Sequence, residues 1–135
     1  MLKSLQGVFT GKAVAHSTEY LTSTNPHGTA KFKGSLASLS DLEAIFSYRA
    51  NVTAHTAANE VAKDLSEEQW NKLAVFFIEP MAMAYGERFA FVSYVKWVSG
   101  IDDEGSRGVL EKLGLLYAML KIVEHGQILC EGGYM

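Results

Sequence analysis

Four histidines are the first candidates for metal binding or acid–base chemistry in this sequence: His16, His27, His55 and His125. A di-iron helical bundle requires Glu-x-x-His on one helix face, and a zinc metalloprotease requires His-Glu-x-x-His. Neither pattern occurs, and the single pair His16 and Glu19 has the first spacing in reverse order. His55 lies in an alanine-rich stretch, which is more typical of a hydrogen-bonded residue between helices than of a ligand. The sequence therefore predicts no metal site.

Cys130 is the single cysteine, so no disulfide can form within the chain, and a reducing compartment is compatible with this. It lies near the expected end of a helix, where the partial negative charge of the helix terminus disfavours a reactive thiolate. We therefore expect a small, buried, unreactive side chain. The serine-nucleophile elbow, the phosphate-binding loop and the dinucleotide fingerprint are also absent. Because none of these motifs is present, we predict no catalytic, cofactor-binding or metal-binding residue.

Aromatic residues with polar tips could line a ligand pocket. Such side chains more often bury area in cores and interfaces while their polar ends stay in contact with water. Both interpretations remain open for this set: Tyr20, Tyr48, Tyr85, Tyr94, Tyr117, Tyr134, Trp70 and Trp97.

Composition excludes several classes of protein. The 135 residues suit one domain, and 48% of them are hydrophobic, which is enough to build a core. The formal net charge is −3 without any basic block, so neither a nucleic-acid footprint nor a polybasic membrane patch is expected. No stretch is apolar and uncharged for the roughly 20 residues of a membrane span.

The elements that must position any site begin with a helix predicted over residues 1–21. Leu2, Leu5 and Val14 lie near one face of it. Residues 22–39 are then rich in Thr, Ser, Asn, Pro and Gly, the composition of turns, and predict a linker.

The second helix is predicted to run from Ser40 to about Leu65. Ser40 and Glu43 fit a capping box, in which the serine hydroxyl accepts from the amide three residues on and the glutamate reaches back. Ser38 is an alternative cap. The apolar stripe is largely alanine in its middle, so a neighbouring helix can lie close there. Its members are Leu39, Leu42, Phe46, Ala50, Ala54, Ala57, Val61 and Leu65.

The third helix is predicted over residues 67–98, and it begins at a second capping box formed by Ser66 and Gln69. Pro80 interrupts it, because a proline inside a helix removes one hydrogen bond and clashes with the carbonyl four residues back, at a cost of ~3 kcal/mol. We expect a kink just before this proline rather than two separate helices. The residues available for burial are Trp70, Leu73, Ala74, Phe77, Met81, Ala84, Phe91, Val95 and Val98.

The last helix is predicted over residues 106–131, after a polar loop at residues 99–107. Gly132 is expected to take the left-handed conformation that commonly ends a helix. One broad apolar face is expected, with Glu111, Lys112, Lys121 and Glu124 on the other side; this face consists of Leu113, Leu116, Tyr117, Leu120 and Val123. In the isolated chain, Tyr117, Leu120, Phe46 and Phe77 are expected to present apolar surface to solvent. Four helices and almost no strand predict an all-α, up-and-down helical bundle.

Three stretches carry a resemblance to a known family. They are F-S-Y-R-A-N-V-T-A-H-T-A-A-N-E-V from Phe46, the pair Trp70 and Asn71, and V-L-x-x-L-x-x-L-Y from Val109 with a closing Gly-x-x-M. Over residues 46–135 the chain resembles the C-terminal helical domain of peroxisomal acyl-CoA oxidases, and residues 1–21 resemble the last helix of that family's dehydrogenase-like part. Tyr85 departs from the family, which commonly has histidine there, and Pro80 is not expected.

The resemblance implies a division of the chain and a reaction. Residues 1–21 would be the terminal helix of a dehydrogenase-like helical domain, 22–39 a linker, and 40–135 a truncated C-terminal-like domain. Full-length members use FAD to desaturate fatty acyl-CoA and release hydrogen peroxide in peroxisomal β-oxidation. No catalytic or flavin-contacting residue of the family finds a matching position here, so the chain alone is expected to be inactive and to bind no flavin.

The resemblance also implies a structural role that supports a homodimer, with self-association through exposed helical faces. A peroxisomal location follows from the resemblance alone, since the C-terminal Gly-Gly-Tyr-Met is not a receptor-read tripeptide. Two other functions stay open: a non-enzymatic helical interaction module, and a bundle that binds haem or a small ligand. Visible absorbance would separate the three functions. A flavin band would support the oxidase, and a Soret band would support haem binding. Neither band, together with a large exposed apolar patch, would support the interaction module.

Overall fold

The computed structural model describes residues 31–63 and 65–135, and within these residues the chain forms helices and no strands. The predicted helix at residues 1–21, and the linker up to residue 30, lie outside this part. The elements are α3 (Leu39–Val61), α4 (Glu67–Leu73), a π-helical segment (Ala74–Ile78), α5 (Glu79–Ser99), α6 (Glu104–Glu124) and α7 (Gly126–Glu131). The all-α prediction is confirmed.

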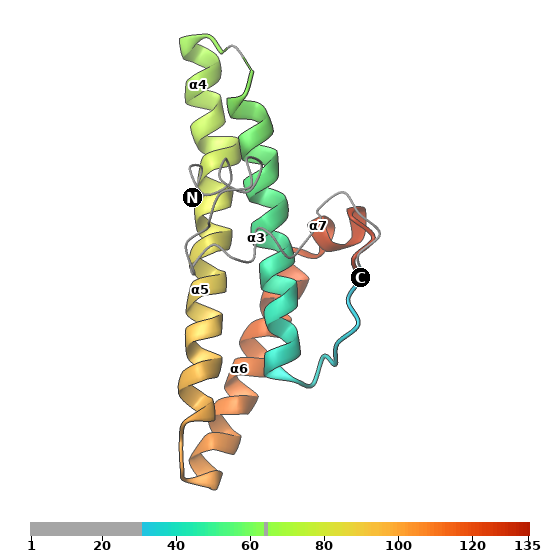
Figure 1. The fold of residues 1–135 in the computed structure, drawn as a ribbon, viewed down its shortest axis with the longest axis vertical. Helices are drawn as coiled ribbons and strands as arrows, with labels where there is room; N and C mark the ends of the chain where they lie inside the picture. Colours follow the sequence, from blue (N-terminus) through green and yellow to red (C-terminus); the bar gives the residue numbers. More distant parts are fainter. Residues whose placement is uncertain (1–30, 64) are drawn as a thin grey trace, which may run out of the picture.

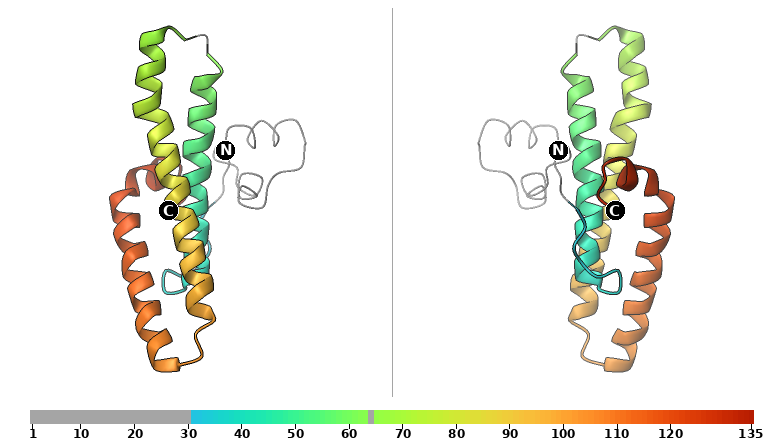
Figure 2. Two further views of the ribbon diagram at one scale, coloured as in Figure 1. Left: turned by 90° about the vertical axis from the view of Figure 1, so that its left-hand side faces the viewer. Right: turned by 90° about the vertical axis from the view of Figure 1, so that its right-hand side faces the viewer.

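The helices run up and down, as predicted. α3 pairs with the continuous rod made of α4, the π-helical segment and α5, in a long antiparallel hairpin (Figure 1). α6 turns back at the end of α5 and packs against the lower half of this hairpin only (Figure 2). None of the described helices is long and apolar enough to cross a membrane.

The start of α3 differs from the predicted capping box. Ser38, the alternative, is the N-cap: its hydroxyl accepts from the Asp41 amide at 3.4 Å. The Asp41 carboxylate in turn accepts from the Ser35 amide at 2.9 Å, so that the chain before the helix is also fixed. The box assigned to Ser40 and Glu43 is therefore wrong.

The hairpin turn confirms the second capping box. The Ser66 hydroxyl accepts from the Gln69 amide at 3.3 Å, and the Gln69 side chain accepts from the Ser66 amide at 2.8 Å. α3 ends at Val61 rather than Leu65. Trp70 is 49% exposed, so it is not the core residue that the helical pattern indicated.

The distortion expected before Pro80 takes the form of the π-helical segment. The Glu79 amide donates to the carbonyl of Ala74, five residues back instead of four. The proline removes one N–H and crowds the carbonyl of Phe76, and a wider turn relieves both problems without ending the helix. α4 and α5 therefore form one rod, as predicted.

Two apolar clusters hold the hairpin together, and both use the predicted stripe of α3. The first contains Ala50, Ala54 and Ala57 against Met81 and Ala84. The second surrounds the stacked rings of Phe46 and Phe91, 4.3 Å apart between centroids, and includes Leu42, Ile45, Tyr48, Ala118, Leu129 and Tyr134. The alanine-rich middle of α3 thus allows close packing where it was expected.

The predicted last helix is two helices. Asp103 caps α6 by accepting from the Ser106 amide at 2.7 Å, which starts the helix two residues before the predicted boundary. α6 ends at Glu124, and α7 follows after His125. The left-handed residue at the end of α7 is Gly133, with φ of 64°, and not Gly132.

The face of α6 that packs inward lies opposite its broad apolar face. Gly114 and Ala118 are buried, whereas Leu113, Leu116 and Leu120 are more than half exposed. A methyl group added at Gly114 would lie 2.8 Å from the Tyr94 ring, so the absence of a side chain is what allows α6 to approach α5. Close approach of the backbones decides the orientation of α6.

Candidate functional site

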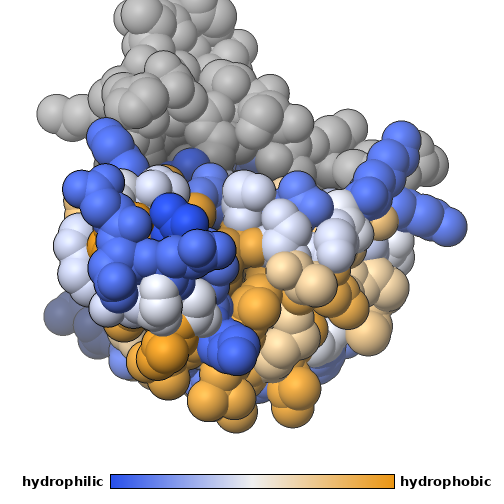
Figure 3. Space-filling model, turned by 90° about the horizontal axis from the view of Figure 1, so that it is seen from below, coloured by the Kyte–Doolittle hydropathy of each residue, from blue (hydrophilic) through white to orange (hydrophobic). Residues whose placement is uncertain are grey.

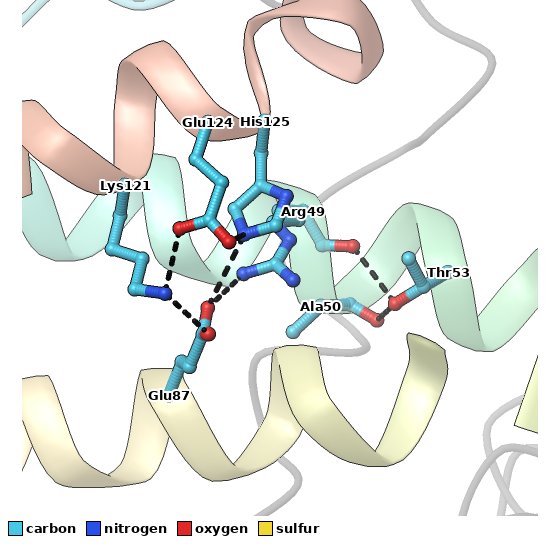
Figure 4. A network of polar contacts seen from close by, with 7 residues as sticks. All are labelled: Arg49, Ala50, Thr53, Glu87, Lys121, Glu124 and His125. Carbon is cyan, nitrogen blue, oxygen red and sulfur yellow. Dashed lines mark hydrogen bonds and ion pairs between the residues drawn. The ribbon is translucent and has the colours of Figure 1, made fainter. Parts of the chain in front are cut away.

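A cluster of charged side chains lies where α3, α5 and α6 meet (Figure 4). Glu87 of α5 is at its centre, with its side chain only 12% exposed, and Arg49 of α3 donates a hydrogen bond to its carboxylate. Lys121 of α6 lies 3.0 Å from the other carboxylate oxygen and 2.7 Å from Glu124. One partly buried carboxylate therefore joins three helices.

The protonation states follow from these contacts. Burial by itself would raise the pKa of Glu87, but the hydrogen bonds and charges of Lys121 and Arg49 outweigh it and hold that pKa below its ordinary value. Burial, together with the charge of Arg49, lowers the pKa of His125. At neutral pH the cluster thus contains two cations, two carboxylates and a neutral imidazole.

This balance of charge favours a structural role for the cluster. His125 Nε2 is 3.7 Å from Glu87, too far for a hydrogen bond, and it is buried without a hydrogen-bond partner among residues 31–63 and 65–135. Each carboxylate is already paired, so Glu87 is poorly suited to act as a general base. The cluster can hold the helices in register; it does not present a free charge to a substrate.

An apolar groove of about 490 Å³ runs between α5 and α6, beside the cluster. Ala90, Phe91, Tyr94, Leu110, Leu113, Gly114 and Tyr117 line it. The Tyr94 hydroxyl donates to the Leu110 carbonyl at 2.7 Å and is thus already engaged. At one end, the Lys121 ammonium group lies 5.9 Å from the Tyr117 ring. The groove offers apolar contact and few polar groups.

The residues considered for chemistry are dispersed. His16, His27 and Tyr20 lie outside the described part of the chain, and His55 is half-buried on α3. Cys130 is exposed, which corrects the expectation of a buried thiol. Tyr48 and Tyr134 stack in the core at 4.0 Å, whereas Tyr94 and Tyr117 line the groove. Both interpretations of the tyrosines therefore hold, for different residues.

Arg49 and Glu87 were not identified from the sequence, although one signal for them exists. Arg49 occupies a buried position on α3 directly before Ala50 of the apolar stripe. A charged side chain at such a position requires a partner, because an unpaired buried charge is costly. The identity of that partner, 38 residues away, depends on how α3 and α5 pair.

Comparison with known protein families adds an independent finding. Residues 38–135 match the family described as acyl-CoA oxidase. No curated protein sequence matches the chain. The match covers most of the chain and includes every described helix from α3 to α7. The chain therefore belongs to the acyl-CoA oxidase family.

Proposed function

We propose that this chain is the C-terminal helical portion of a flavin-dependent acyl-CoA oxidase, in which it has a structural role and supports the dimer. The observation that carries the proposal is the combination of the family match with a site that is built for packing: a self-neutralised charge cluster beside an apolar groove. The parent enzyme would desaturate fatty acyl-CoA in peroxisomes and release hydrogen peroxide.

The described residues do not by themselves fit a flavin. A flavin's pyrophosphate is typically held by free amides at a helix N-terminus or by unpaired cations. Here Ser38, Ser66 and Asp103 already cap the starts of α3, α4 and α6. The cations nearest the groove, Lys121 and Arg49, are bound to Glu87. Flavin binding and the general base are therefore proposed for segments of the parent that have no counterpart in these residues.

The test is an assay of the isolated chain for peroxide release with acyl-CoAs of several chain lengths, and a visible spectrum after incubation with FAD. We expect no turnover and no retained flavin. Turnover above a blank without protein would show that the chemistry lies in this chain. The reading frame upstream of Met1 supplies the complementary test, since a flavin domain encoded there in frame supports the proposal and its absence counts against it.

A non-enzymatic helical interaction module is the second candidate. The observation that favours it is the large exposed apolar surface of α6. The same upstream reading frame separates the two candidates, because an interaction module needs no flavin domain.

A further inference from the structure

The upper half of the hairpin, above α7, is not covered by α6 (Figures 1 and 2). A groove of about 420 Å³ lies there between α3, the π-helical segment and α7. Two paired helices leave a furrow into which a third helix fits, and α6 occupies such a position in the lower half. This groove, the upper groove, is lined by Tyr48, Val52, Thr56, Phe76, Phe77 and Ile128, among others.

The walls of the upper groove suit an apolar occupant. Phe76 is 67% exposed in it, and Val52, Phe77 and Ile128 are half-buried. The Thr56 hydroxyl donates to the Val52 carbonyl at 2.9 Å and is thus already bonded within α3. Apolar side chains can therefore enter the groove without leaving this hydroxyl unsatisfied.

The chain enters the described part of the structure directly beside the upper groove. The Phe32 amide donates to the Tyr134 carbonyl at 2.8 Å, and the two rings lie 6.2 Å apart between centroids. The Tyr134 ring in turn stacks on Tyr48 at 4.0 Å, and Tyr48 lines the groove. Residues 22–30 can span up to ~30 Å when extended. Residues 1–21 can therefore reach the groove while Phe32 keeps its contacts.

The sequence of residues 1–21 matches what the groove accepts. Leu2, Leu5 and Phe9 recur at helical intervals and form an apolar face. A helix of this length extends for about 31 Å, so it cannot bury that face against itself and needs a neighbouring surface. The furrow between α3 and the rod supplies a surface of the right shape.

The charges of the two parts are complementary. In the described residues from 57 to 80, two glutamates are paired with the two lysines, with N–O distances of 2.6 and 2.8 Å. Glu67 and Glu79 then leave an excess of negative charge. Residues 1–21 carry Lys3 and Lys12 but only one acid, Glu19. Opposite net charges favour the approach of the segment to this half of the hairpin.

We propose that residues 1–21 fold back as a helix into the upper groove of the same chain, with their apolar face toward Phe76. The upper half of the hairpin then becomes a three-helix bundle, as the lower half is with α6. This docking requires neither a flavin domain nor acyl-CoA, so it goes beyond the proposed oxidase function.

The experiment measures amide hydrogen exchange of residues 1–21 by mass spectrometry, in the full 135-residue chain and in Phe76→Lys. We expect protection of this segment in the wild type. A lysine in the apolar contact should speed its exchange at least ~10-fold, because the docked state is less populated. Phe76 is largely exposed, so the hairpin should stay folded, and the exchange of α3 checks this.

Val75→Lys is the matched control. Val75 is 58% exposed in the same π-helical segment but does not line the groove, so this variant should keep the protection. A second pair of variants changes the segment itself and leaves the described helices untouched. Leu5→Lys should speed the exchange of residues 1–21, whereas Ser4→Lys should not, because Ser4 lies ~100° around the helix from Leu5.

α6 offers a competing apolar surface, on which Leu116 is 57% exposed. Seen from below, hydrophobic residues gather on one side of this end of the molecule (Figure 3). Leu116→Lys should leave the exchange of residues 1–21 unchanged. Faster exchange in Leu116→Lys than in Phe76→Lys would place the segment on α6 and overturn the proposal.

Three further results would also overturn it. They are an unprotected segment in the wild type, equal effects of Phe76→Lys and Val75→Lys, and protection that is lost on dilution, which would mean docking on a second copy. None of these results depends on flavin or on turnover. Failure of the docking is therefore distinguishable from failure of the oxidase assignment, which the peroxide assay and the upstream reading frame test.

Discussion

Glu87 shows how a single residue determines the character of the site. A carboxylate at a helix junction would be a candidate base if it were alone, but Arg49 and Lys121 engage both of its oxygens. Removing either partner of such a partly buried pair should destabilise the fold, because the other charge is left uncompensated. The arrangement stabilises one relative position of α3, α5 and α6.

Among the groups of the cluster with shifted pKa values, His125 and Glu87 predict a loss of stability on acidification. His125 has a lowered pKa in the folded state, so the unfolded chain binds a proton first as the pH falls below the ordinary value of 6.5. Glu87 also has a lowered pKa, and its contribution is lost as the pH falls below 4.5. The free energy of unfolding should therefore decrease in two steps, each by at most about 1.4 kcal/mol per pH unit.

Urea denaturation over a pH range that extends from 8 to about 2 units below the ordinary pKa of a glutamate measures this decrease. His125→Gln should remove the first step and leave the second. If the wild type and His125→Gln lose stability in parallel between pH 7 and pH 5, the assignment of the first step to His125 is wrong.

At the scale of the helix, two glycines in helix interiors should respond in opposite ways to an added methyl group. Gly86 in α5 has open space where a side chain would lie, whereas a methyl group at Gly114 in α6 would lie 2.8 Å from the Tyr94 ring and 3.0 Å from Leu39. Gly86→Ala should stabilise by up to about 1 kcal/mol through helix propensity. Gly114→Ala should destabilise by about 1–2 kcal/mol, since overpacking exceeds the gain in propensity.

Thermal and chemical denaturation of both glycine variants check this pair. The Tyr94 ring cannot easily move aside, because its hydroxyl is bonded to the Leu110 carbonyl. Stabilisation by both substitutions would mean that α6 does not lie close to α5.

The joint between α3 and α4 supplies a second prediction for the elements. Ser66→Ala removes the hydroxyl that accepts from the Gln69 amide and should lower the free energy of unfolding by ~1 kcal/mol. Ser93→Ala is the control, because Ser93 is exposed in the interior of α5 and caps no helix. Equal denaturation midpoints for Ser66→Ala and the wild type would contradict the importance of this cap.

At the scale of the whole molecule, the long hairpin is only partly covered. α6 packs on its lower half, and α7 folds across near the middle (Figures 1 and 2). We expected Tyr117, Leu120, Phe46 and Phe77 to present apolar surface. Tyr117 and Leu120 do, whereas Phe46 is buried in the core and Phe77 is half-buried. Exposed apolar side chains lie on α6 and also along the rod of α4, the π-helical segment and α5, where Val75, Phe76 and Phe89 are more than half exposed.

The sequence by itself determined the helical class, the joint at Ser66 and the packing stripe of α3. These features follow from local chemistry: a hydroxyl three residues from an amide, a proline without an N–H, and apolar residues at helical intervals. The family resemblance over residues 46–135 could likewise be inferred from the sequence, and the match over residues 38–135 confirms it.

Only the tertiary structure decided which face of α6 is buried and which charges meet. α6 is apolar around most of its circumference, so periodicity could not choose between the leucines and the face of Gly114 and Ala118. The choice depends on the close approach of α6 to α5 and α3, which the small residues Gly114 and Ala118 permit. The pairing of Arg49 with Glu87 likewise depends on the register of two helices far apart in sequence, and no local pattern encodes it.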